Sequence, residues 1–431
     1  MRPYASQLRL SQCFCALCIS IGLLWANQFA QAATLKAGKG QPFTTIHQAI
    51  QSAAEGDTIQ VQPGIYRERN IIIPKRLTLQ GIGYPVIDGE RKWEVISIKA
   101  DGIVVEGFKV INGGRSSIDD LAGIKVYNVR DVIIRNNILD DNIFAIYLQY
   151  ASACLVTGNR IRAYGTTEQL SGNGIHCWKS DSVRIIGNEI SGHRDGIYFE
   201  FVTGSIIWRN QSHDNIRYGL HFMFSHNDAY ISNIFTRNGA GVAVMYTHGI
   251  RMFNNFFEDS WGESAYGLLL KEISDSYIEG NHFSQNTIGI HMEGSSRISM
   301  RRNLFESNGY AMRVQGSCED DELLQNDFTG NTFDISTNSS LSLNHFEGNY
   351  WDKYEGYDLI RDGIGDVPYH PVSLFSTVVE STPPAMMLFR SFMVTLLDKS
   401  EKVLPSITPE GLKDEHPKMK PNLRPGKSTQ S

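Results

Sequence analysis

Short runs of alternating apolar and polar residues recur along the middle of the chain. Examples are GIYFEFVTGSII at residues 196–207 and GIHMEGSSRISM at residues 289–300. Alternation with a period of two is typical of strands with one buried face, and the Gly, Asn and Ser residues between the runs indicate turns. The pattern therefore predicts many short strands joined by tight turns.

A small residue followed by an apolar one marks each repeat of this pattern. The markers are Gly123, Ala145, Gly174, Gly196, Gly219, Gly241, Gly267, Gly289 and Ala311. Successive markers are 22, 29, 22, 23, 22, 26, 22 and 22 residues apart. A unit of about 22 residues cannot bury its own apolar face, whereas stacked units form a continuous core. The surplus residues of the two longest steps, at 163–173 and 260–266, are expected to form loops that leave the stack.

An asparagine keeps the same phase, 14 residues after each marker. These residues are Asn137, Asn159, Asn188, Asn210, Asn233, Asn255, Asn281 and Asn303. Asparagine tolerates a turn with positive φ, and stacked amides could form a ladder of hydrogen bonds. The Leu-x-x-Leu-x-Leu pattern of a leucine-rich horseshoe is absent, and a propeller needs longer repeats. We therefore predict an all-β fold, a single-stranded right-handed parallel β-helix with an N-terminal cap and a short apolar C-terminal helix.

The flanking segments complete the predicted organisation. Basic Arg2 and Arg9 precede an apolar run shorter than the ~20 residues of a membrane span, and Ala30-Gln31-Ala32 resembles a cleavage site. These features predict a cleaved signal peptide and export. The expected segments are a signal peptide at 1–32, an N-terminal cap at 33–57, the β-helix at 58–348, a C-terminal cap at 349–384, an apolar helix at 385–398 and a disordered tail at 399–431.

Composition narrows the classes of function. The formal net charge is -6, which gives no electrostatic reason to expect nucleic-acid binding. Three cysteines lie in the predicted signal peptide, so Cys154, Cys177 and Cys318 remain. An odd number of widely spaced cysteines is not a disulfide framework, although one bridge could form after export. Cys154 and Cys177 fall at positions expected to face the core.

The repeat places sulfur and imidazole side chains together. Met223 and Met245 occupy the same position of successive coils, as do His226 and His248, and His221 lies beside them on the predicted outer face. Strand neighbours lie ~4.8 Å apart, so each pair should stack. Thioether and imidazole ligands favour Cu(I). An outer patch of methionine can equally be a contact surface for another protein, without a metal.

Two other clusters of polar residues indicate different chemistries. The run Gly192 to Gly196 brings His193, Arg194 and Asp195 together one strand from Glu200, which could serve acid–base chemistry on a polysaccharide, as in a lyase or epimerase. Ordinary turn composition explains the same residues. Asp358, Asp362 and Asp366 resemble part of a calcium loop, but the apolar Ile360 breaks the alternation of acids, which makes calcium doubtful.

The segment AMMLFRSFMVTLLD at residues 385–398 is strongly apolar and follows two prolines. A helix of this length is too short to cross a bilayer. It could dock on the solenoid, lie at a membrane surface or contact a membrane protein.

The exported repeats, the runs GLHFMFSHND and GVAVMYTHG, and the ending GNYWDKYEGYDLIRDGIGDVPY together resemble the NosD family over nearly the whole chain after the signal peptide. The resemblance implies a periplasmic, non-catalytic accessory protein for the copper centres of nitrous oxide reductase. It would be peripheral to the membrane and work with an ABC transporter of the ATPase NosF and the permease NosY. Copper would come from the lipoprotein NosL and go to the apo reductase. The contact with the permease would be made by Met386, Met387, Leu388, Phe389, Phe392 and Met393. A polysaccharide-acting enzyme and a carbohydrate-binding surface protein remain the alternatives.

Overall fold

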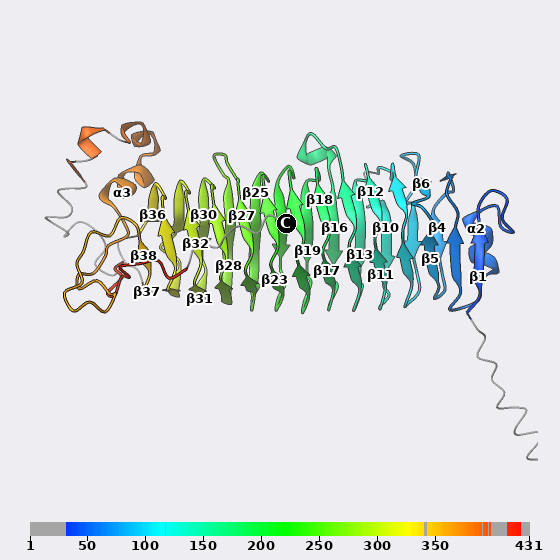
Figure 1. The fold of residues 1–431 in the computed structure, drawn as a ribbon. Coiled ribbons are helices and arrows are strands. Elements are labelled where there is room, and N and C mark those ends of the chain that lie inside the picture. The colour runs from blue at the N-terminus through cyan, green and yellow to red at the C-terminus, as the bar shows by residue number, and fades with distance from the viewer. Residues whose placement is uncertain are drawn as a thin grey trace, which may run out of the picture.

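The chain folds into a parallel β-helix, which confirms the predicted fold class. The computed structural model describes residues 32–116, 118–339, 343–389, 391–394, 396–397 and 412–423. The coils stack side by side along one axis, with α2 (Ile46–Ser52) at one end and α3 (Leu374–Ser381) at the other (Figure 1). The predicted signal peptide lies outside the described residues, apart from residue 32.

Each complete coil contributes one strand to each of three rows. The first row is β4 (Ile71–Ile73), β7 (Ile96–Ile98), β10 (Ala122–Tyr127), β13 (Phe144–Gln149), β16 (Asn173–Trp178), β19 (Asp195–Glu200), β22 (Tyr218–Met223), β25 (Ala240–His248), β28 (Tyr266–Glu279), β30 (Ile288–Glu293), β33 (Tyr310–Val314) and β36 (Phe333–Thr337). The second row is β1 (Thr34–Ala37), β2 (Thr58–Val61), β5 (Thr78–Gly81), β8 (Val104–Glu106), β11 (Ile133–Arg135), β14 (Leu155–Thr157), β17 (Arg184–Ile186), β20 (Ile206–Trp208), β23 (Ala229–Ile231), β26 (Arg251–Phe253), β31 (Ser296–Arg301), β34 (Glu319–Leu324) and β37 (Leu343–Glu347). The long strand β28 runs through both rows and joins them.

The third row forms a separate sheet. It consists of β3 (Ile65–Tyr66), β6 (Val86–Asp88), β9 (Lys109–Ile111), β12 (Ile138–Asp140), β15 (Arg160–Arg162), β18 (Glu189–Ser191), β21 (Gln211–His213), β24 (Ile234–Thr236), β27 (Phe256–Glu258), β29 (His282–Ser284), β32 (Leu304–Glu306), β35 (Asp327–Thr329) and β38 (Tyr350–Trp351). The two surplus segments of the repeat lie between β15 and β16, where η1 (Glu168–Leu170) forms, and between β27 and β28, as expected.

The phased asparagines form the predicted ladder inside the solenoid. Asn233 donates through its backbone N and its Nδ2 to Oδ1 of Asn255, at 2.9 and 3.0 Å. Asn255 makes the same two donations to Asn281, and its Nδ2 also donates to the Tyr230 carbonyl. The pattern continues beyond the expected residues through Asn326 to Asn349. Each buried amide is thereby satisfied by its neighbours in the coils before and after it.

The prediction that these asparagines adopt positive φ was wrong. The left-handed backbone belongs instead to the residue immediately before the ladder asparagine, as in Asn136 (φ 53°), Arg209 (φ 53°) and Asn254 (φ 53°). The turn is made one position earlier, which leaves the ladder residue free to point its amide into the interior.

Apolar side chains fill the interior column beside the ladder. Phe257, Phe283, Phe305, Phe328 and Trp351 stack face to face with ring centroids 4.1 to 5.0 Å apart. Ser212 interrupts this column, and its hydroxyl donates to the Gly219 carbonyl and accepts from Nδ2 of Asn215. Cys154, Cys177 and Cys318 are buried and free, so the structure contains no disulfide between them.

One carboxyl group, Asp228, is buried in the solenoid wall with a single strong partner. Its Oδ1 accepts from the Ser205 backbone N at 2.7 Å. Burial raises the pKa of Asp228 to about 8, although that hydrogen bond opposes the shift. Since the unfolded chain ionises near 3.8, the folded state holds an extra proton between about pH 4 and pH 8, and its stability falls as the pH rises through this window.

Replacing Asp228 by asparagine should therefore stabilise the protein at pH 8.5 by about 1–3 kcal/mol, because an amide keeps the bond from Ser205 and needs no proton. The gain should fade towards pH 4. Urea unfolding of both proteins across this range measures it. Glu263→Gln, at an exposed carboxylate of the loop between β27 and β28, is the control and should leave the stability within about 0.5 kcal/mol of the wild type across the range.

The C-terminal region differs from the predicted division. The regular helix is α3, inside the segment assigned to the cap, and the segment expected to be helical from 385 begins with the 3₁₀ helix η2 (Pro383–Leu388). Consecutive prolines at 383 and 384 lack the backbone N–H that would continue α3. We call α3, η2 and residues 391–397, as far as they are described, the C-terminal apolar unit. No helix among the described residues is long and apolar enough to cross a membrane.

The prediction of a disordered tail over 399–431 was wrong for residues 412–423. This segment, the C-terminal strap, lies against the last coils, where Leu412 is 2% exposed and Asp414 is fully buried. The polar composition of this segment predicts disorder, but specific hydrogen bonds hold the segment against the end of the solenoid.

Candidate functional site

The candidate site lies on the outer side of the first row, at the ends of β22 and β25. Met223 pairs in register with Met245, and both side chains are partly exposed. Met223 aligns on its other side with Glu200 of β19, and Met245 with Lys271 of β28. The 22-residue interval therefore brings the two thioethers together on adjacent strands, one strand spacing apart, as the repeat predicts.

The two histidines also stack. The rings of His226 and His248 have centroids 4.1 Å apart and an interplanar angle of 18°. Burial and the neighbouring His248 both lower the pKa of His226. This imidazole is therefore neutral at pH 7, which is the form that binds metals.

The hydrogen bonds of His226 indicate which ring nitrogen carries the proton. Its Nδ1 accepts from the backbone N of His248 at 3.4 Å and lies 3.2 Å from Oγ1 of Thr247. A backbone N–H can only donate, so the proton of the neutral ring is on Nε2, and a metal at Nε2 requires this proton to move to Nδ1, where the Thr247 hydroxyl can accept it. Face-to-face stacking aims the ring lone pairs in parallel, so two-nitrogen coordination of one ion requires the rings to turn apart.

His221 lies in a different setting from the other four residues. It is 5% exposed, and its Nδ1 is 3.2 Å from a guanidinium nitrogen of Arg217 and 3.6 Å from Oδ2 of Asp195. Both contacts join the ring to the Asp195–Arg217 ion pair. His221 points outward but belongs to a buried polar network, since Arg217 and Tyr218 cover it, so it lacks the exposure expected of a ligand.

Asp195 is the centre of that network and is fully buried. Arg217 binds both carboxylate oxygens, and Nε of Arg194 lies 3.5 Å from Oδ2. Burial alone would raise the pKa of Asp195, but the contacts of His221 and Arg217 lower it to about 2. His193 is also fully buried. The cluster considered for polysaccharide chemistry therefore holds a locked ion pair, which is unsuited to proton transfer at neutral pH.

The network reaches the sulfur of the site through Tyr198. Its ring packs between His176 and His221, with both centroid distances 4.8 Å, and its hydroxyl donates to Sδ of Met223 at 3.6 Å. A thioether sulfur has two lone pairs, so this contact orients Met223 and leaves one pair free for a soft metal.

A row of aromatic rings beside the methionines was missed at the sequence level. Phe201, Phe224 and Tyr246 stack with centroids 5.3 and 5.1 Å apart, and Phe201 is 44% exposed. All three have positive φ, which is unfavourable for bulky side chains and is retained where the surrounding structure requires it. Each follows the +4 position of its coil, so a search of column +5 would have found them.

The donor types fit a soft cation better than a hard one. No group of three or more His, Cys, Asp or Glu side chains in the described ranges is arranged to hold a metal, and a site of methionine and histidine is of another type. The carboxylates of Asp358 and Asp362 in the cap instead accept hydrogen bonds from backbone N–H groups of their own loop. These contacts give the acids of that loop a structural role.

The C-terminal apolar unit is anchored on the last coils and exposes apolar side chains. Phe375 and Phe389 contact Phe333 of β36, and Arg313 of β33 pairs with Glu380 at 2.5 Å. The predicted contact residues divide between the two sides of this unit. Met386 packs against the small core, whereas Met387, Leu388, Phe389, Phe392 and Met393 are exposed by 90, 52, 38, 81 and 57%.

Known proteins resemble this chain in sequence. Residues 161–356, which contain the two methionines and both stacked histidines, match the family described as periplasmic copper-binding protein (NosD). The probable ABC transporter binding protein NosD of Pseudomonas aeruginosa is 28% identical over 405 residues, covering 81% of this chain and 86% of the relative. A protein of the same description from Stutzerimonas stutzeri is 28% identical over 356 residues, covering 78% of this chain and 80% of the relative.

Solved structures resemble the chain in fold. The surface adhesin PfbA of Streptococcus pneumoniae superposes with a TM-score of 0.57 at 14% identity, covering 68% of this chain and 89% of the adhesin. The α-1,3-glucanase of Streptomyces thermodiastaticus superposes with a TM-score of 0.54, also at 14% identity, covering 71% and 65%. At this identity the likeness concerns the fold alone. Over most of its length the chain is therefore similar to proteins described as NosD, and residues 161–356 match the model of that family.

Proposed function

We propose that the protein is a periplasmic accessory protein that handles copper together with an ABC transporter, in the maturation of nitrous oxide reductase. The description of its family as periplasmic and copper-binding supports the compartment and the metal. The description of its relatives as ABC transporter binding proteins supports the transporter. In this role copper is cargo received and passed on, and the protein itself performs no catalysis.

The observation that carries the proposal is the pairing of Met223 with Met245 beside the stacked His226 and His248. Thioether sulfur and neutral imidazole are the ligands that Cu(I) accepts readily and that Ca²⁺ and Mg²⁺ avoid. The four side chains are reached from solvent at the end of two adjacent strands. A shallow, exposed site of this kind suits transfer of an ion between proteins better than permanent storage.

The proposed route follows the family resemblance. The lipoprotein NosL would deliver copper, the apo reductase would receive it, and the C-terminal apolar unit would hold the protein against the permease NosY, which NosF drives. The copper site and the apolar unit would then act at separate places on the solenoid, since one lies on β22 and β25 and the other is anchored on β33 and β36.

Titration with Cu(I) tests the site. A variant with Met223→Leu, Met245→Leu, His226→Asn and His248→Asn should lose more than about tenfold in affinity, since each 1.4 kcal/mol of lost ligand energy is tenfold in affinity. Competition with a coloured Cu(I) chelator measures the change. X-ray absorption of the loaded wild-type protein should show sulfur and nitrogen scatterers.

The matched control replaces His282 and His345, which pair with carboxylates on other faces of the solenoid, by asparagine. This protein should bind Cu(I) as the wild type does. Equal affinity in the wild-type and fourfold-substituted proteins would remove the proposed site.

A further inference from the structure

The asparagine ladder ends on a residue from the far C-terminus. Asn349, its last asparagine, donates through its backbone N and its Nδ2 to Oδ2 of Asp414, both at 2.9 Å. These are the two donations that every earlier asparagine makes to its successor. Asp414 therefore occupies the place of one more rung, although 65 residues separate it from Asn349.

The surroundings of Asp414 explain why this rung is an aspartate. Oδ1 accepts from the backbone N of Gly348 and of His416, both at 3.1 Å. Oδ2 also accepts from Nε1 of Trp351 at 3.2 Å. All five contacts are donors, and a carboxylate accepts only, whereas an amide would turn a donor towards some of them. The buried anion is therefore specific to this position.

The backbone of the strap also takes the place of a coil. Asp414 and Lys418 form parallel bridges with Phe346 and Tyr350, in the sense of all coil-to-coil pairing. On its other side the strap forms antiparallel bridges with the cap, from Asp414 to Tyr369 and from Lys418 to Ile364. The strap is thus inserted between the last coil and the cap loop.

A second carboxylate fixes the far end of the strap. Asp327 of β35 accepts from the backbone N and Nδ2 of Asn422 and from the backbone N of Leu423, at 2.8 to 3.0 Å. The strap is held chiefly by these two carboxylates and by backbone hydrogen bonds, with few buried apolar side chains.

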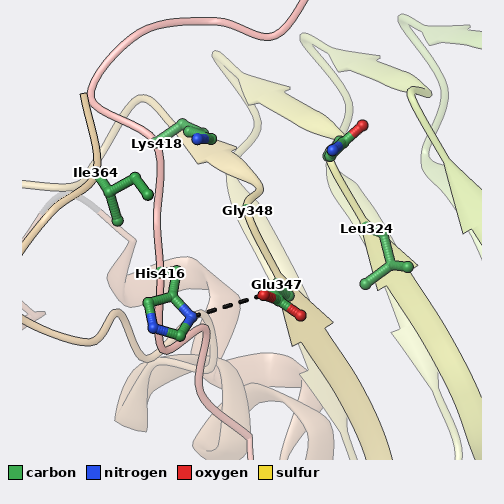
Figure 2. Close-up of a pocket in the computed structure, with 7 residues that line it drawn as sticks. Leu324, Glu347, Gly348, Ile364, His416 and Lys418 are labelled. Carbon is green, nitrogen blue, oxygen red and sulfur yellow. Dashed lines mark ion pairs between the residues drawn. The ribbon is translucent and has the colours of Figure 1, made fainter. Parts of the chain in front are cut away.

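The strap and the last coils do not fill all of the space between them. A depression of about 480 Å³ lies between the strap and the last coils. Figure 2 shows His416 of the strap facing Glu347 of β37 across it, with Nδ1 and Oε1 3.7 Å apart, and Ile364 of the cap beside it. Water can therefore reach the inner side of the strap.

Each end of the solenoid carries a strand of the same row. β1 and β37 are the first and last strands of the same row. β1 pairs with β2 on one side, and on the other side the described residues give it one bridge, between Ala37 and Phe43. An uncovered last coil would offer backbone donors and acceptors that the first coil of another molecule could pair with in the same parallel sense. Such a head-to-tail contact does not close on itself and so builds chains of molecules.

We propose that residues 412–423 are a strap that closes the solenoid in place of a further coil and prevents this end from pairing with a second copy of the chain. The carboxylate of Asp414 holds the strap in place. Loss of this carboxylate frees the strap and uncovers the last coil, while the asparagine ladder of the preceding coils stays intact.

The full-length variant Asp414→Ala tests the strap, with Glu415→Ala, at the adjacent exposed carboxylate, as control. Asp414→Ala should increase the rate of tryptic cleavage after Lys418 by about tenfold or more, because five hydrogen bonds to a buried anion are lost. Its mass by light scattering should rise with concentration above that of the wild type, with an unchanged far-UV circular dichroism spectrum. Glu415→Ala should match the wild type in all three measurements.

Addition of a peptide with the sequence of residues 412–423 separates loss of the strap from general damage. The peptide should return the Asp414→Ala protein to the mass of the wild type, because it refills the vacated rung. The proposal is overturned if the strap of Asp414→Ala resists trypsin as the wild type does, or if it is released and the mass stays equal to that of the wild type at every concentration. Association that the peptide does not reverse would also overturn it.

Discussion

Replacing Asn255 by leucine should cost about 3–5 kcal/mol of stability, because two or three buried polar groups lose their partners at about 1–3 kcal/mol each. Asn255 is fully buried in the middle of the ladder. Its Oδ1 accepts both donations of Asn233, and its Nδ2 satisfies the Tyr230 carbonyl. Leucine has the same branched arrangement of four side-chain heavy atoms as asparagine but neither accepts nor donates. Urea unfolding followed by circular dichroism measures the loss.

A solenoid adds a further consequence. Because each coil contacts only its neighbours, a weak central coil divides the stack into two parts that can unfold separately. The unfolding curve of Asn255→Leu should therefore broaden or split. Gln211→Leu, the same loss of an amide at an exposed position of β21, should stay within about 0.5 kcal/mol of the wild type. A loss equally small for Asn255→Leu would contradict the ladder's role in stability.

The repeat could be predicted from sequence because its evidence is local and recurs in every coil. One coil fixes which residues face inward, and the markers fix the register, so Met223 had to align with Met245. The ladder followed from the phase of the asparagines. The turn did not, because the residue with positive φ varies between Asn, Gly, Arg and Ser from coil to coil and leaves no single-residue signal.

The sequence predicts which side chains lie on the outer face, but it does not predict how exposed each of them is to solvent. His221 and Met223 both point outward from β22, yet only Met223 remains partly exposed. The difference arises from Arg217 and Tyr218, whose side chains fold over His221 from the start of the same strand. Alternation along a strand decides the face of a side chain, but contacts with neighbours decide whether solvent reaches it.

The strap escaped prediction for a different reason. Residues 412–423 are polar and contain three lysines and two prolines, a composition that is typical of disorder. Their order depends on two carboxylates: Asp414, which meets four donors from a distant part of the chain, and Asp327, which accepts from the far end of the strap. No local pattern announces such a contact, because the site exists only after the last coil has formed.

The proposed copper site and the apolar unit make separable contributions to the proposed function. The Met and His side chains belong to β22 and β25, whereas the apolar unit rests on β33 and β36. The two places lie on different coils, and each coil contacts only its neighbours. A variant that loses one activity should therefore keep the other.

Converting Met387 and Phe392 together to glutamate should abolish binding to the ABC transporter, with a loss of more than about 100-fold in affinity. These side chains are 90% and 81% exposed, so the substitutions leave the packing against Phe333 intact. Large apolar side chains at the centre of an interface commonly contribute 2 kcal/mol or more each, and a buried unpaired carboxylate adds a further cost. Co-purification from membranes, and titration against the detergent-solubilised transporter, measure the loss.

The control is a double variant in which two other exposed apolar side chains are replaced by glutamate, one near the N-terminal end of the solenoid and one on a loop. Ile65 and Leu170 are 65% and 62% exposed, and their double conversion to glutamate should leave transporter binding unchanged. Cu(I) affinity should match the wild type in both double variants, because neither touches Met223, Met245, His226 or His248. Loss of binding in the first variant alone therefore assigns the contact to the C-terminal apolar unit. Retention of the transporter by the Met387→Glu, Phe392→Glu protein would instead exclude this unit and shift the contact to the apolar side chains of the solenoid wall.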